Sequence, residues 1–153
     1  MVERSLKYMD PESTLTLREA LTEYYELNPS LLRLEDLPDD AAEMFRCHDV
    51  GHVVFGCDTS LRGETLIDTW TIFGSTSGLR GYAEYFKYPQ VNAIFAEAGF
   101  TSIAVEFLRC LPDVIRVAYR GLRLERKWPW KEHESFLEVP LNEIRHDFNI
   151  API

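Results

Sequence analysis

The segment between Pro38 and Gly56 constrains the fold of this chain more than any other. Pro38 is followed by two aspartates, which favour the positively polarised N-terminal end of a helix. Apolar residues at 41, 42, 44 and 45 and at 53–55 flank the centre of the segment with helical spacing, and Gly56 is a typical helix stop. The sequence therefore predicts a buried helix over residues 39–56.

The centre of this predicted helix carries a pattern typical of a metal site. His48 and His52 are four residues apart, so their rings lie on one face of a helix, with Cβ atoms roughly 5–6 Å apart. Glu64 follows His52 after eleven residues and can return from a second helix as a further ligand. Asp49 can either reach the same ion, orient a ligand, or stay off the metal and move protons. Imidazoles with carboxylates suit a divalent ion. Zinc is the first expectation, with manganese, iron, cobalt or magnesium as alternatives.

A histidine pair of this kind can also be an ordinary part of a helix, either solvated or packed in the core. The apolar flanks make burial the more reasonable prediction here. A buried cluster of two histidines and an aspartate without an ion or other partner would be costly, because its polar groups would lose their hydration. We therefore prefer the metal site.

The rest of the chain also has helical patterns. Thr16 and Glu19 form a capping box, and Asn28 before a proline is a stop signal, so a helix is expected between them. Further helices are expected at about 61–73, 79–87, 101–123 and 141–148. The segment 74–78 is either a kink or a short loop, and Pro112 either restarts or kinks the long helix. No period-two alternation and no internal repeat occurs, so we predict an all-α fold, a multi-helix bundle forming a single domain over residues 1–153.

The composition excludes several classes of protein. A formal net charge of −9 argues against nucleic-acid binding, which needs concentrated basic residues. Three cysteines are an odd number at unremarkable spacings, which favours reduced thiols in the cytoplasm. No signal pattern occurs in residues 1–10, and no stretch approaches the ~20 apolar residues of a membrane span. We expect a cytoplasmic protein, with peripheral contact at a membrane as the alternative.

One strongly basic stretch stands out against the acidic whole. Six basic residues lie between 109 and 127: Arg109, Arg116, Arg120, Arg123, Arg126 and Lys127. A solvated helix face is the first interpretation. A surface that meets phosphate, carboxylate or a membrane is the alternative.

The pattern His48-Asp49-x-x-His52, eleven residues and Glu64 resembles the motif of the Coq4 family of ubiquinone-biosynthesis proteins. The likeness extends to Gly56, Thr59 and Gly63 in the spacer. It returns in Trp130-Lys131-Glu132-His133, in Pro140-Leu141 with Arg145, and in Phe148-Asn149-Ile150, and so covers residues 45–70 and 128–150.

The resemblance implies a metal-dependent enzyme that acts on a prenylated benzoate. The reaction would be oxidative decarboxylation at ring carbon C1, with Asp49 as a catalytic group and His48, Asp49, His52 and Glu64 holding the ion. The partners it implies are a prenylated quinone precursor or isoprenoid lipid and other quinone-biosynthesis enzymes. A homodimer is also compatible.

Two other functions remain open from the sequence. In the first, the protein is a non-catalytic scaffold that holds a polyprenyl lipid and organises other enzymes, with a structural metal. In the second, it is an unrelated metal-dependent hydrolase, since HDxxH loosely resembles HExxH. The shorter aspartate side chain counts against the hydrolase.

Overall fold

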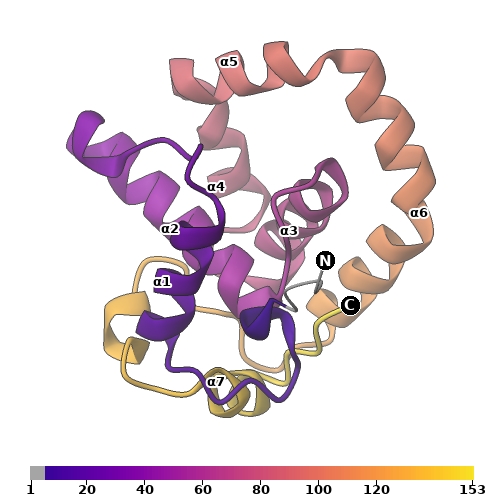
Figure 1. Ribbon diagram of the computed structural model, residues 1–153. Coiled ribbons are helices and arrows are strands. Elements are labelled where there is room, and N and C mark those ends of the chain that lie inside the picture. The colour runs from indigo at the N-terminus through magenta and orange to yellow at the C-terminus, as the bar shows by residue number, and fades with distance from the viewer. Residues whose placement is uncertain (1–5) are drawn as a thin grey trace, which may run out of the picture.

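Seven α-helices form the fold in the computed structural model, which describes residues 6–153 (Figure 1). They are α1 (Leu17–Leu27), α2 (Asp39–Phe55), α3 (Leu61–Gly74), α4 (Gly78–Glu84), α5 (Pro89–Ala98), α6 (Phe100–Leu122) and α7 (Leu141–Phe148). Four short 3₁₀ helices connect them: η1 (Lys7–Met9), η2 (Leu34–Asp36), η3 (Tyr85–Lys87) and η4 (His133–Phe136). The described residues contain no β-strand, only two isolated bridges. The all-α prediction is confirmed; the first five residues of the expected domain lie outside the described part.

The helix ends follow the local signals in the sequence. Thr16 and Glu19 form a reciprocal capping box at the start of α1, and Asn28 ends that helix. The motif helix α2 begins directly after Pro38, and it ends at Gly56 in the left-handed conformation (φ 68°), which glycine adopts without steric cost. The predicted boundaries of this helix are therefore confirmed to within a residue.

Helix α2 lies at the centre of the hydrophobic core. Its second half is buried on all sides, against α1 and α3 and close to the C-terminal segment. Gly51 permits this approach, since a Cβ at that position would lie 2.9 Å from Ile67 Cδ1 on α3. Phe55 of α2 stacks on Trp70 of α3, with ring centroids 4.7 Å apart. The histidines of the motif are thus carried by the most firmly packed helix.

Arg145 of α7 fastens the C-terminal end of α2 to the N-terminal segment. Its buried guanidinium donates to the carbonyl oxygens of Val53 (2.9 Å) and Val54 (2.9 Å) at the end of α2. It also donates to those of Tyr8 (2.6 Å) and Asp10 (2.6 Å). At the helix end this cation gives the Val54 carbonyl its only donor among the described residues, adds a second donor to that of Val53, and complements the helix dipole.

The second half of the chain differs in detail from the sequence expectations. The segment after Gly74 is a short loop, in which Ser75 pairs with Trp128. The helix expected at 79–87 divides into α4 and η3. Pro112 does not interrupt α6, which runs continuously through it. Pro112 and Leu108 are both exposed there, so water can solvate the Leu108 carbonyl that the missing N–H leaves unbonded.

Helices α5 and α6 arch around the outside of α3 and α4 (Figure 1). They meet at Gly99 (φ 79°) with a bend of 79°. No single helix among the described residues is long and apolar enough to cross a membrane, although this bent pair passes that test jointly.

Candidate metal centre

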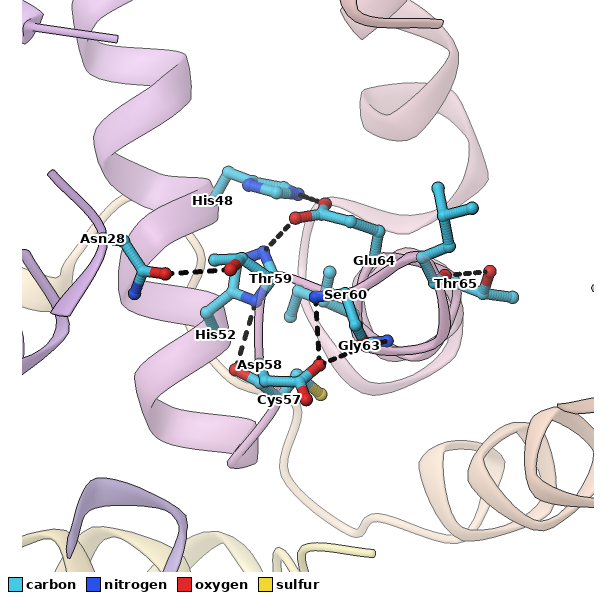
Figure 2. A network of polar contacts seen from close by, with 12 residues as sticks. Asn28, His48, His52, Cys57, Asp58, Thr59, Ser60, Gly63, Glu64 and Thr65 are labelled. Carbon is cyan, nitrogen blue, oxygen red and sulfur yellow. Dashed lines mark hydrogen bonds and ion pairs between the residues drawn. The ribbon is translucent and has the colours of Figure 1, made fainter. Parts of the chain in front are cut away.

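The tight turn between α2 and α3 brings the two halves of the motif together. After Gly56, the turn reverses the chain, and Ser60 caps α3 by accepting from the Gly63 amide at 3.1 Å. Gly63 has no room for a side chain, because a Cβ would lie 2.0 Å from the Asp58 carbonyl oxygen. This close approach places Glu64, in the first turn of α3, directly opposite the histidines of α2 (Figure 2).

Each oxygen of the Glu64 carboxylate faces one histidine. Oε1 lies 3.3 Å from His52 Nε2, and Oε2 lies 3.6 Å from His48 Nε2 (Figure 2). All three ligand atoms lie within 4.8 Å of one another. Ligands held tetrahedrally at about 2.0–2.1 Å from zinc are about 3.3–3.4 Å apart, so the two measured separations suit a shared ion. His48, His52 and Glu64 can hold a metal.

The Nε2 atom of His52 lacks a hydrogen-bond partner among the described residues. Nδ1 lies 3.2 Å from the carbonyl oxygen of Cys57, to which it can only donate, so in the neutral ring the lone pair is on Nε2. Nε2 is completely buried and has no hydrogen-bond partner within residues 6–153, although it lies 3.3 Å from Glu64 Oε1. A lone pair and a carboxylate oxygen that face one another 3.3 Å apart repel unless a cation lies between them. This donor set therefore fits a divalent ion.

The electrostatics of the cluster favour the ligating protonation states of His48 and Glu64, whereas His52 competes for a proton. Burial, followed by the neighbouring charge of His52, lowers the pKa of His48 to about 4, so the ring is neutral at pH 7. Burial would raise the pKa of Glu64, but its pairing with His52 outweighs that effect and lowers the pKa. Burial would likewise lower the pKa of His52, but Glu64 and then Asp49 outweigh it and raise the pKa. A proton on His52 and a metal ion are thus alternative occupants of one position.

Asp49 is not in the converging set, which has three members among the described residues. It turns toward α1, where the Tyr25 hydroxyl donates to its Oδ2 at 3.0 Å. Burial raises the pKa of its carboxyl to about 7, against the opposing influence of Tyr25. The structure thus brings together three of the four expected ligands, and the role of Asp49 as a fourth ligand stays a prediction. The negative charge of Asp49 contributes to the raised pKa of His52. The ring of Tyr24 stacks on that of His52 (centroids 5.5 Å apart).

An apolar cavity of about 130 Å³ opens beside the cluster between α2, α3, α4, α5 and the start of α6. His48 and Glu64 form part of its wall, and the rest is largely aliphatic and aromatic. The metal candidate thus lies at one polar end of an otherwise apolar space.

Three polar residues of this cavity are absent from the sequence prediction. Asp68 lies one turn after Glu64 and accepts a hydrogen bond from the Tyr82 hydroxyl at 3.0 Å. Burial raises the pKa of Asp68 to about 7. The Tyr85 hydroxyl is buried and has no hydrogen-bond partner among the described residues. The four-residue spacing from Glu64 is a signal that identifies Asp68; nothing local identifies the two tyrosines.

The cysteines take no part in the cluster through their sulfur atoms. All three are free and buried, as expected for reduced thiols. Cys57 contributes only its carbonyl oxygen to His52, and the Cys47 sulfur lies 4.0 Å from Nδ1 of His133.

No protein-family model, curated protein or solved structure matches this chain. The site is therefore interpreted from its own geometry and chemistry.

Proposed function

We propose that this protein is a Coq4-like, metal-binding protein of prenylquinone biosynthesis that acts on a prenylated benzoate. The observation that carries the proposal is the juxtaposition of three metal-ligating groups with an apolar cavity. An amphiphilic molecule with one acidic, ring-bearing end and one isoprenoid end matches both parts of such a site. The motif resemblance supports the same ligand class.

The residues of the site would have different roles. His48, His52 and Glu64 would hold the divalent ion, which when bound supplies positive charge to a carboxylate or phenolate oxygen. The unpartnered Tyr85 hydroxyl can donate to an oxygen of the same ligand. Asp68 lines the cavity and has a pKa near neutrality, so it can take up or release a proton there. Asp49 is outside the cavity lining, and we therefore assign the proton-carrying role to Asp68.

The size of the cavity limits what it can enclose. At about 130 Å³ it is smaller than the roughly 300–1,000 Å³ of sites that enclose a drug-sized ligand. We expect it to hold one end of the molecule, with the longer part of the tail extending beside α5 and α6. Affinity should rise with tail length at ~25 cal/mol per Å² of apolar surface buried, until the tail leaves the protein.

The proposed reaction replaces the ring carboxylate with a hydroxyl group. The carbon–carbon bond to the carboxylate breaks and CO₂ leaves, while a new carbon–oxygen bond forms. With water as the oxygen source, the carboxylate form of the substrate releases two electrons and one proton. Zinc takes no electrons, so the assay must supply dioxygen or another two-electron acceptor.

A non-catalytic lipid-binding role is the second candidate. The dominance of apolar side chains in the cavity wall favours it, because tail binding alone requires no reactive group. In this case the metal cluster would fasten α2 to α3 and anchor the acidic end of the lipid.

The test begins with metal analysis of the purified protein, where we expect about one divalent ion per chain. His48→Ala combined with His52→Ala should abolish stoichiometric binding. The matched control is His146→Ala, which removes an exposed histidine outside the cluster. Full occupancy in the double variant would contradict the assignment of the site.

Ligand binding is then measured with 4-hydroxybenzoates of increasing prenyl length. Affinity that rises with tail length and falls in part in the double variant supports separate head and tail contacts. Formation of the hydroxylated, decarboxylated ring favours the enzyme, and binding without turnover favours the lipid-binding protein. Affinity that is indifferent to tail length would refute both.

A further inference from the structure

Helix α6 presents a row of large apolar side chains to the outside of the molecule. We call it the α6 stripe: Phe100, Leu108, Leu111, Ile115, Tyr119 and Leu122. From Leu108 onward these residues recur every three or four positions, so they lie along one face of the helix. Leu108 is 68% exposed and Ile115 is 61% exposed. A continuous apolar row of this kind on the surface marks an interaction site.

The opposite face of α6 is permanently occupied. Val117 and Gly121 are buried against α3, and a Cβ at Gly121 would lie 2.9 Å from the Phe73 carbonyl carbon. In this packing α6 presents only its outer face, along the outer edge of the molecule (Figure 1).

A row of arginines borders the stripe on one side. Arg109, Arg116, Arg120 and Arg123 each directly follow a stripe residue, so each lies about 100° further round the helix. Arg109 and Arg116 are mostly exposed, although each also pairs with an acidic residue three positions earlier. Residues 100–123 contain four arginines and two acidic side chains, a net charge of +2 in a chain of net charge −9. Arg120 also donates to the carbonyl oxygens of Ala151 and Pro152. The arginines that border the stripe thus outnumber the acidic side chains of α6.

We propose that the α6 stripe docks on the surface of an anionic lipid bilayer, with α6 lying in the plane of the interface. Apolar side chains would enter the boundary of the acyl chains, while the arginines reach the lipid phosphates. A second copy joined by a two-fold contact would offer the same basic row and no row of opposite charge, so its complementarity is poorer.

The cavity wall includes a side chain at the surface. Ile94 of α5 and Ile103 of α6 both belong to this wall, and Ile94 is itself half exposed. The docking proposal does not depend on the proposed function, because the stripe and the arginines lie outside the metal cluster.

The test is co-sedimentation of the full chain, without added metal or ligand, with vesicles of phosphatidylcholine alone or mixed with phosphatidylglycerol. We expect binding to the mixed vesicles, weakened by salt because part of the attraction is electrostatic. Leu108→Glu combined with Ile115→Glu should reduce binding at least tenfold. Leu32→Glu, which changes an exposed leucine between α1 and α2, is the matched control and should bind normally.

A second pair of changes keeps the test decisive if the double glutamate variant folds poorly. Arg109→Gln combined with Arg116→Gln should reduce the preference for phosphatidylglycerol several-fold while leaving the stripe intact. Circular dichroism checks the fold of every variant. Failure of the unmodified chain to bind mixed vesicles would overturn the proposal, as would normal binding by both double variants. A dimer that the glutamate changes dissociate, without vesicle binding, would assign the stripe to a second copy instead.

Discussion

Replacing Arg145 tests how the C-terminal part of the chain stabilises the motif helix α2. Arg145→Met keeps most of the apolar side-chain volume but removes all four hydrogen bonds to buried or half-buried carbonyl oxygens. Charge-assisted hydrogen bonds contribute about 1.5–3 kcal/mol each, and the dehydration of the guanidinium offsets much of that sum. The carbonyl oxygens of Val54 and Tyr8 lose their only donor among the described residues, which makes the truncation strongly unfavourable. We expect a loss of about 3–5 kcal/mol from the free energy of unfolding.

This loss is large compared with the roughly 5–15 kcal/mol that stabilises a typical domain. At about 2–4 °C per kcal/mol for a chain of this size, the melting temperature should fall by roughly 6–20 °C. Urea unfolding followed by circular dichroism measures the free energy, and a thermal scan measures the melting temperature. The N-terminal segment should also become more sensitive to protease, since its hydrogen bonds from Arg145 to Tyr8 and Asp10 are lost.

Arg18→Met is the matched control, because that arginine pairs with Glu138 at the surface, where both side chains are mostly exposed. A surface pair of this kind contributes about 0–1 kcal/mol. A loss below about 1 kcal/mol for Arg145→Met, or equal losses in both variants, would refute the view that Arg145 fastens α2.

Three further changes probe the site. Gly63→Ala should destabilise the protein by about 1–3 kcal/mol and weaken metal binding, because its Cβ has no room beside the Asp58 carbonyl; unchanged metal stoichiometry and affinity would contradict this. Asp68 has its pKa raised from 3.8 to about 7, so the folded state retains a proton that the unfolded state loses, and stability falls as the pH rises from about 4 to 7. Asp49, whose pKa is also raised to about 7, contributes a slope of the same sign. Asp68→Asn should therefore make the slope less steep in metal-free protein, as measured by urea unfolding at several pH values; an unaltered slope would exclude a contribution from Asp68. Tyr85→Phe removes a buried hydroxyl without a partner, so stability should hold or rise slightly, while affinity for a prenylated benzoate falls about tenfold by titration. A marked loss of stability would show that the hydroxyl has a structural role instead.

Much of the helical framework follows from short-range chemistry that can be seen in the sequence. The capping box of Thr16, the start after Pro38 and the left-handed end at Gly56 each involve residues within one helical turn. Such signals do not depend on the rest of the fold, and they predict the ends of α1 and α2. The i,i+4 spacing of His48 and His52 is local in the same sense, because the helix itself brings the two imidazoles to one face.

The remaining features depend on contacts between distant segments. The sequence places Asp49 at the metal because it neighbours His48, but its hydrogen-bond partner Tyr25 lies 24 residues away on α1 and draws the carboxylate to the other side of α2. Tyr85 joins the cavity only because α4 and η3 fold back beside α2 and α3. No local pattern specifies that return.

The outer face of α6 shows most clearly the difference between what the local sequence specifies and what contacts between distant segments decide. Its sequence shows an apolar helix with basic residues, which is equally typical of a core helix and of a surface helix that meets a partner. The choice depends on which face packs against α3, and the close approach of Gly121 to Phe73 decides it. Helix positions and the spacing of ligating residues were therefore determined by the sequence alone, because they depend on neighbours within a few residues. Exposure of the stripe, enclosure of the cavity and the direction of each buried carboxylate were decided only by tertiary packing, because they depend on which segments meet.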